Sequence, residues 1–232
     1  MNYRGIVFDK DGTLLDFNRT WLPIYLYAAS EFSDGVAALA EQLLMSHGFD
    51  SQRQRFHSGS LLAAGNNQQI ADAWALQLQQ PEQVEAIARR LNEIFRDQGR
   101  IQATPVEGLA GTLEQLKSRG YALGVATADS YQGIINTLQS FNVLEQFDFL
   151  AGYDSGHGVK PEAGMVAAFC EHTGIPSEQV VVVGDNRHDI EMGRNANAGL
   201  CIGVLTGTSE RADLEAIADL VLDDISHLPD HL

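Results

Sequence analysis

Short runs of apolar residues, many of them β-branched, recur along the chain, and each ends in a polar or glycine-containing turn. The runs show no strict alternation of apolar and polar positions, which is typical of strands buried on both faces of a parallel sheet. They lie at residues 3–9, 121–127, 147–152, 179–185 and 200–207, with a weaker run at 218–224. Helical patterns separate the runs, such as Leu109, Leu113 and Leu116 ahead of Gly120. This alternation predicts an α/β fold built on a doubly wound, Rossmann-like parallel sheet.

Residues 17–100 interrupt this rhythm, because they contain helical patterns and no convincing strand. The alternation of strands and helices resumes near Pro105. We therefore expect a helical domain, residues 17–100, that is inserted after the first strand of an α/β core. That core would consist of residues 1–16 and 101–232.

Composition and charge narrow the classes of partner. The 232 residues are 44% hydrophobic and 20% charged, which is ordinary for a globular protein. A net charge of −16, from 15 basic and 31 acidic residues, repels phosphate backbones and anionic lipid, so nucleic acid and membrane are not expected partners. The sequence shows neither a secretory signal nor an apolar stretch of membrane-spanning length, and we expect a cytoplasmic protein.

Polar side chains follow several of the predicted strands, either where the strand ends or, for Lys160 and Asp189, in the loop or first helical turn beyond it. In chain order, these side chains are Asp9, Asp11, Thr127, Lys160, Asp185 and Asp189. Ligands of open α/β sheets bind beyond the carboxyl ends of the strands, so these groups are expected to converge there. Any one aspartate could instead be a helix N-cap, and it is the convergence that favours a site. Clustered carboxylates require a cation, and oxygen ligands favour Mg²⁺.

Four motifs in a fixed order make the chain resemble the haloacid dehalogenase (HAD) superfamily. The motifs are DxDGT as Asp9-Lys10-Asp11-Gly12-Thr13, a Thr as Thr127, a Lys as Lys160 in GVKPE, and GDxxxD from Gly184 to Asp189. The helical insert is similar to a C1-type cap. The runs DKDGTLLDF and GDNRHDIEMGRNA are similar to phosphoglycolate-phosphatase-like members. Asp11 at the second acidic position of the first motif favours a phosphatase or phosphomutase over a dehalogenase.

The resemblance implies a role for each matching residue. Asp9 would be the nucleophile that forms an aspartyl-phosphate, and Asp11 would be the general acid and then the general base. Thr127 would bind phosphoryl oxygens, and Lys160 would pair with Asp9 and the phosphoryl group. The implied Mg²⁺ ligands are the Asp9 carboxylate, the Asp11 backbone carbonyl and Asp185, with Asp189 in or next to that shell.

Substrate contacts are expected from both parts of the chain. Those expected in the core are Lys10, Gly12, Thr13 and Ala128, with the backbone N–H groups of residues 11–13 on the phosphoryl oxygens. Ala128 stands where many relatives have Asn, so either Asp129, Ser130 or a backbone N–H replaces the amide contact, or the substrate differs. In the insert, residues 57–69 read as a non-helical loop over the active site, and Gly65 and Asn66 are its expected substrate contacts. Arg53 would recognise a substrate carboxylate, or else be a solvated surface residue.

Three functions are compatible with these motifs. The leading prediction is a Mg²⁺-dependent phosphatase for a small phosphomonoester, with a phosphoglycolate-like substrate as the first choice. The alternative is a sugar phosphomutase of the same fold, which would return the phosphoryl group to substrate. A non-catalytic, phospho-accepting receiver-like module is less favoured, because it would have no counterpart of the insert. Either a monomer or a homodimer is compatible with the sequence.

Overall fold

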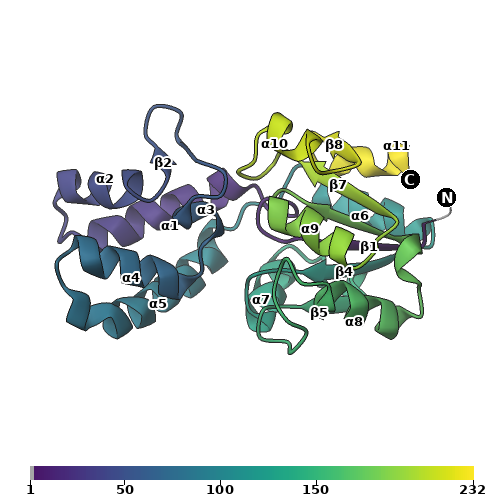
Figure 1. Cartoon of the computed structure of the whole chain (residues 1–232), viewed down its shortest axis with the longest axis horizontal. Helices are drawn as coiled ribbons and strands as arrows, with labels where there is room; N and C mark the ends of the chain where they lie inside the picture. Colours follow the sequence, from purple (N-terminus) through teal and green to yellow (C-terminus); the bar gives the residue numbers. More distant parts are fainter. Residues whose placement is uncertain (1–2) are drawn as a thin grey trace. The chain divides into compact units, whose positions relative to one another are not determined.

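The computed structural model describes residues 3–232, apart from the side chain of Arg100, and Figure 1 labels its elements. The chain divides into two compact units. An α/β unit contains the residues up to Phe17 together with Pro105–Leu232, and a helical unit contains Asn18–Thr104. No helix in residues 3–232 combines the length and the hydropathy needed to cross a bilayer.

Six parallel strands form the sheet of the α/β unit, in the order β5-β4-β1-β6-β7-β8 (Figure 1). Their bounds are β1 Gly5–Phe8, β4 Ala122–Ala126, β5 Phe149–Ala151, β6 Val180–Gly184, β7 Leu200–Val204 and β8 Leu220–Leu222. Each strand lies within one of the predicted apolar runs, and the predicted α/β class is confirmed. The strand β1 lies between β4 and β6, so the ends of these three strands are neighbours at one edge of the sheet.

Helices cover both faces of this sheet, which is why its strands are apolar throughout. Ile6 and Phe8 of β1 belong to one hydrophobic core, and Val7 belongs to the core on the opposite face. The first core is completed by α6 Leu109–Ser118, α7 Tyr131–Ser140 and α11 Leu228–His231. The second core is completed by α8 Gly164–Thr173, α9 Arg187–Asn195 and α10 Arg211–Glu215. Short 3₁₀ turns are η2 Leu144–Gln146, η3 Ser177–Gln179 and η4 Ile225–His227.

The helical unit has its own aromatic core, and the predicted helical insertion after β1 is confirmed. Its helices are α1 Phe17–Phe32, α2 Ala37–Met45, α3 Leu61–Ala64, α4 Asn67–Gln77, η1 Pro81–Gln83 and α5 Val84–Gln102. Trp74 of α4 is fully buried. The ring of Tyr25 packs edge to face on Phe95, with centroids 5.4 Å apart. Such aromatic pairs add stability beyond the area that they bury.

One feature of the helical unit contradicts the prediction that residues 17–100 contain no strand. A two-stranded antiparallel hairpin pairs β2 Phe49–Asp50 with β3 Arg55–Phe56. Each strand has two residues, which is too short for an alternating pattern to be visible in the sequence. Asp50 closes the turn, since its Oδ1 accepts the backbone N–H of Gln52 at 2.9 Å and of Arg53 at 3.0 Å.

The stretch 57–69 is also not the non-helical loop that was predicted. Four residues with good helix propensity form α3 at Leu61–Ala64, and α4 already begins at Asn67. Asn66 caps α4 through a reciprocal pair of hydrogen bonds with Gln69, each 2.9 Å long. The asparagine that was expected in a loop therefore begins a helix.

Candidate active site

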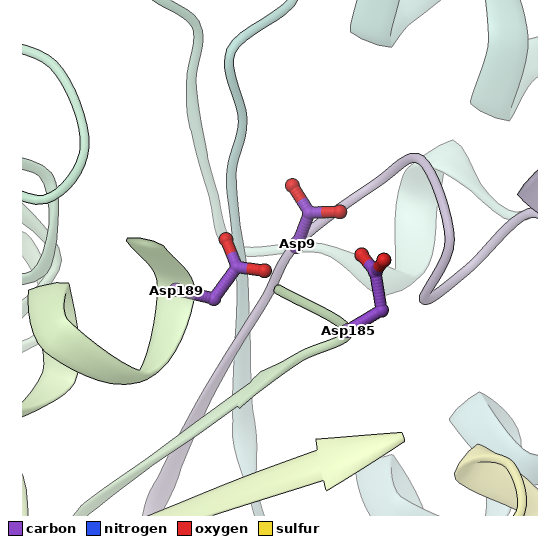
Figure 2. A group of neighbouring side chains, drawn as sticks. All are labelled: Asp9, Asp185 and Asp189. Carbon is purple, nitrogen blue, oxygen red and sulfur yellow. The ribbon is translucent and has the colours of Figure 1, made fainter. Parts of the chain in front are cut away.

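Three buried carboxylates gather at the carboxyl edge of the sheet. Asp9 follows β1, Asp185 follows β6, and Asp189 lies in the first turn of α9. Their exposed fractions are 6%, 4% and 2%. One carboxylate oxygen from each lies within 4.8 Å of the others (Figure 2). The structure thus brings together three of the predicted metal ligands.

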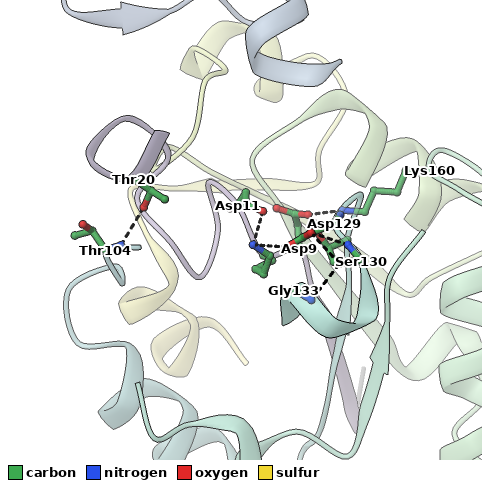
Figure 3. A network of polar contacts seen from close by, with 10 residues as sticks. Asp9, Asp11, Thr20, Thr104, Asp129, Ser130, Gly133 and Lys160 are labelled. Atoms are coloured by element: carbon green, nitrogen blue, oxygen red, sulfur yellow. Dashed lines mark hydrogen bonds and ion pairs between the residues drawn. The ribbon is translucent and has the colours of Figure 1, made fainter. Parts of the chain in front are cut away.

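Lys160 lies between two of these carboxylates. Its Nζ is 2.5 Å from Asp9 Oδ1 (Figure 3) and 2.5 Å from Asp189 Oδ1. The Lys160 side chain is 7% exposed. Burial alone would lower the pKa of this ammonium, but the Asp189 and Asp9 carboxylates outweigh burial and raise it. Lys160 therefore stays charged, and one ammonium faces three carboxylates.

The pKa values of the carboxyl groups reflect this excess of carboxylates and the burial of the site. Burial, with Asp189 and Asp11 adding to it against the opposing effect of Lys160, raises the pKa of Asp9 to about 7. Burial and the Asp189 and Asp9 carboxylates raise the pKa of Asp185 well above its usual range. A divalent cation among these oxygens would remove the penalty of ionising them. Carboxylate ligands without sulfur or imidazole suit a hard cation.

The GDNRHD sequence positions Asp189 through its own backbone. Asn186 is the N-cap of α9, and its N–H donates to Asp189 Oδ2 at 3.0 Å in a capping box. Lys160 contacts the other oxygen of the same carboxylate. Asp189 is thus held at both oxygens, by the start of α9 and by Lys160.

The turn that follows Asp9 leaves room for Asp185. Gly12 has a φ of +93°, and a Cβ at that position would lie 2.5 Å from Asp185 Oδ1, so glycine is required there for both reasons. The N–H of Gly12 donates to Leu15 O at 2.8 Å, and that of Thr13 to Lys10 O at 3.4 Å. These two N–H groups, predicted to bind phosphoryl oxygens, therefore have carbonyl partners in this structure.

The side-chain hydroxyl of Thr13, in the same turn, differs from these N–H groups. Thr13 is fully buried, and its Oγ1 has no hydrogen-bond partner among the described residues. Thr127, at the end of β4, is 1% exposed, and its Oγ1 accepts the N–H of Asp129 at 3.1 Å. Ala128, which lies between Thr127 and Asp129 in the sequence, is exposed. A buried hydroxyl without a partner costs free energy unless a ligand or water satisfies it, which favours a ligand beside Thr13.

The loop after β7 contributes to the site and was not selected from the sequence. Thr208 N donates to Asp185 Oδ2 at 3.1 Å, and Thr206 Oγ1 donates to Gly12 O at 2.7 Å. A Cβ on Gly207 would lie 1.7 Å from Asp185 Oδ2. The signal that could have identified this loop is its position, because Thr-Gly-Thr directly follows an apolar strand in the sequence.

The remaining predicted substrate contacts have neighbours or roles within their own units. Lys10 is 3% exposed and forms ion pairs with Asp11 and Asp129. In the helical unit, the Arg53 side chain is 64% exposed, and its Nε is 3.8 Å from Asp50 Oδ2 in the hairpin turn. Gly65 ends α3, and Asn66 caps α4. Substrate contact by these insert residues stays a prediction.

The family of this chain follows from a comparison with known protein families. The family model described as haloacid dehalogenase-like hydrolase matches residues 6–202. The chain belongs to this family. The match covers the strand before Asp9 and continues through β6 and α9 into β7, so all the residues of the carboxylate cluster lie inside it. The chain is therefore a haloacid dehalogenase-like hydrolase, as its motifs predicted.

Individual relatives of this haloacid dehalogenase-like hydrolase differ in the activity that they carry. The chain is 26% identical to the N-acetylmuramic acid 6-phosphate phosphatase of Pseudomonas aeruginosa, over 84% of this chain and 79% of that protein. It is 25% identical to the pyrophosphatase PpaX of Bacillus mycoides, over 98% and 96% of the two chains. A crystal structure of a predicted phosphoglycolate phosphatase from Haemophilus somnus has a TM-score of 0.76 at 20% identity, covering 100% of this chain and 98% of that one. The last likeness shows the shared fold.

Proposed function

We propose that this hydrolase is a Mg²⁺-dependent phosphatase that cleaves a small phosphomonoester through an aspartyl-phosphate. The observation that carries the proposal is the buried cluster of Asp9, Asp185 and Asp189 around Lys160. The donor set fits Mg²⁺, which would be held by the Asp9 carboxylate, the Asp11 backbone carbonyl and Asp185, with Asp189 beside them. Bound Mg²⁺ would supply positive charge to the phosphoryl oxygens and to these carboxylates.

The residues of the chain divide the reaction into two steps. In the first, a carboxylate oxygen of Asp9 attacks phosphorus, the P–O bond of the ester breaks, and Asp11 gives its proton to the departing alkoxide. In the second, water attacks the phosphorus of the aspartyl-phosphate, Asp11 takes a proton from that water, and inorganic phosphate leaves Asp9. Lys160 and Thr127 would stabilise the charge on the phosphoryl oxygens in both steps.

A panel of phosphate compounds tests this proposal. We suggest 2-phosphoglycolate, N-acetylmuramic acid 6-phosphate, pyrophosphate and glucose 1-phosphate, each with MgCl₂ or EDTA, with phosphate release as the readout. Release should fall by at least about 100-fold in EDTA, because the uncompensated carboxylates would repel an anionic substrate. We expect a phosphomonoester, with 2-phosphoglycolate the first choice, to be cleaved faster than pyrophosphate. Conversion of glucose 1-phosphate to its 6-phosphate without phosphate release would contradict the proposal and favour a mutase.

A second prediction concerns the effect of pH on Mg²⁺ binding. The pKa of Asp9 is about 7 in the metal-free protein, against a reference value of 3.8, so the folded state binds more protons than the unfolded state between these pH values. The metal-free protein should therefore lose stability as pH rises from about 4 to about 7. Mg²⁺ competes with the Asp9 proton, and its stabilising effect should grow over the same range.

Thermal unfolding checks this prediction directly. The increase in Tm on adding MgCl₂ to protein in EDTA-treated buffer should be larger at pH 8 than at pH 5 by about 4 °C or more. Asp9→Asn lacks the titrating carboxyl group and should show a smaller dependence on pH. An increase of equal size at both pH values in the wild-type protein would contradict the assignment of Asp9 as a Mg²⁺ ligand.

A further inference from the structure

Lys10, inside the first motif, has a buried ammonium group that the proposed chemistry does not use. Its side chain is 3% exposed, and its Nζ lies 2.7 Å from Asp11 Oδ2 and 3.1 Å from Asp129 Oδ2. Figure 3 labels the two carboxylates, Asp11 and Asp129. The ammonium thus connects Asp11, in the turn after β1, with Asp129, in the loop after β4. The strands β1 and β4 pair directly in the sheet.

Asp129 is itself held in place by the start of α7. Its Oδ1 accepts the N–H of Ser130 at 2.7 Å, while Ser130 caps α7 by accepting the N–H of Gly133 at 3.1 Å. A Cβ on Gly133 would lie 2.3 Å from Asp129 Oδ2, so glycine leaves the space that this carboxylate occupies. The anchor of Lys10 is therefore a fixed part of the α/β unit.

A buried ammonium costs free energy unless carboxylates compensate it. This chain places two buried ammonium groups, those of Lys10 and Lys160, at one site. Its sequence contains three lysines, Lys10, Lys117 and Lys160, of which the first and last are buried beside the carboxylates of the site. Burial alone would lower the pKa of Lys10, but Asp11 and Asp129 outweigh burial and raise it. Lys10 is thus a permanent cation whose partners are protein carboxylates.

We propose that Lys10 is a positioning residue that holds the Asp11 carboxyl group in one orientation beside Asp9. The inference rests on the proposed function, in which Asp11 exchanges the proton. Proton transfer requires a donor within hydrogen-bond distance of the leaving oxygen, and a displacement of about 1 Å can cost about 100-fold in rate. Asp129 would act one step further away, by holding the ammonium that holds Asp11.

The choice of leaving group separates this role from a merely structural one. The alkoxide that leaves β-glycerophosphate needs a proton, whereas 4-nitrophenolate leaves 4-nitrophenyl phosphate without one. In Lys10→Met, the rate of alcohol release in a single turnover with enzyme in excess should fall by about 10- to 100-fold for β-glycerophosphate and by less than about threefold for 4-nitrophenyl phosphate. This rate reports the first step alone, before Asp11 acts as the base on water in the step that both esters share. The enzyme concentration that gives half the maximal single-turnover rate should stay within about threefold for both esters, because the phosphoryl-binding groups are unchanged.

Two further variants make the result decisive. Asp11→Asn, which removes the proton donor, should show the same selectivity for the activated ester. Lys117→Met is the matched control, since Lys117 forms an ion pair of 2.8 Å with Asp148, which directly precedes β5 at the opposite edge of the sheet. It should change the single-turnover rate for both esters by less than about twofold.

The outcomes distinguish this inference from the proposed function. Equal losses on both esters in Lys10→Met, together with a selective Asp11→Asn, would overturn the role of Lys10 and leave the phosphatase proposal standing. Equal losses in Asp11→Asn would overturn the acid role of Asp11 and the role of Lys10 with it. If Lys10→Met does not fold, Lys10→Gln retains an N–H donor and should show the same selectivity at reduced size, and equal losses in that variant would again overturn the inference.

Discussion

Replacing Asp9 by asparagine is expected to lower kcat by at least about 1,000-fold while the protein remains folded. The amide has the shape of the carboxylate but cannot form an acyl phosphate with the substrate. The folded state should not suffer, because burial raises the pKa of Asp9 to about 7 and so makes the ionised form the unfavourable one. In metal-free buffer at pH 8, Asp9→Asn should therefore unfold at the same temperature as the wild-type protein or above it.

Phosphate release and thermal unfolding, measured on the same preparations, check both halves of this prediction. The control is Asp230→Asn, which changes an exposed aspartate of α11 in the same unit and should alter kcat by less than about twofold. Activity within tenfold of wild type in Asp9→Asn would sink the nucleophile assignment. A large decrease in Tm would instead show that the Asp9 carboxylate stabilises the fold, which its raised pKa contradicts.

The sheet could be predicted from the sequence because its physical cause is visible there. A strand that is buried on both faces must be apolar at every position, as β6 is from Val180 to Val183. Its polar neighbours must then follow it, which placed Asp185 at the edge of the sheet. The hairpin of β2 and β3 shows this cause too weakly to be read, since its buried face is the single pair Phe49 and Phe56, one residue from each two-residue strand. The turn at Asp50 closes it.

The site was predictable in position but not in detail. The spacing of the motifs placed Asp9 and Asp185 at the ends of adjacent strands and Lys160 in the loop after β5, and the structure brings them together. The sequence could not reveal where the long side chain of Lys10 turns, because that depends on Asp129, a residue more than a hundred positions away. Nor could it reveal that Gly207 must lack a Cβ, because only the packing against Asp185 requires it.

Replacing Lys160 by methionine should lower kcat by about 100- to 1,000-fold, the range found when a preorganised stabilising group is removed from an active site. Methionine keeps the unbranched side chain but removes the charge that contacts Asp9 and Asp189. Three buried carboxylates would then face one another without the ammonium. Metal-free Lys160→Met should accordingly have a lower Tm than the wild-type protein at pH 8, and Mg²⁺ should restore more of it than in wild type.

The pH dependence of that deficit shows whether charge is its cause. At pH 5, below the pKa of about 7 for Asp9, this carboxyl group is protonated in the folded state and needs no ammonium beside it. The Tm difference between Lys160→Met and wild type should therefore be smaller at pH 5 than at pH 8 in EDTA. Lys117→Met, which removes the ion pair with Asp148, should show a small difference of similar size at both pH values. A deficit of Lys160→Met that is independent of pH would mean that its side chain supports the site by packing, and the electrostatic account of Lys160 would fail.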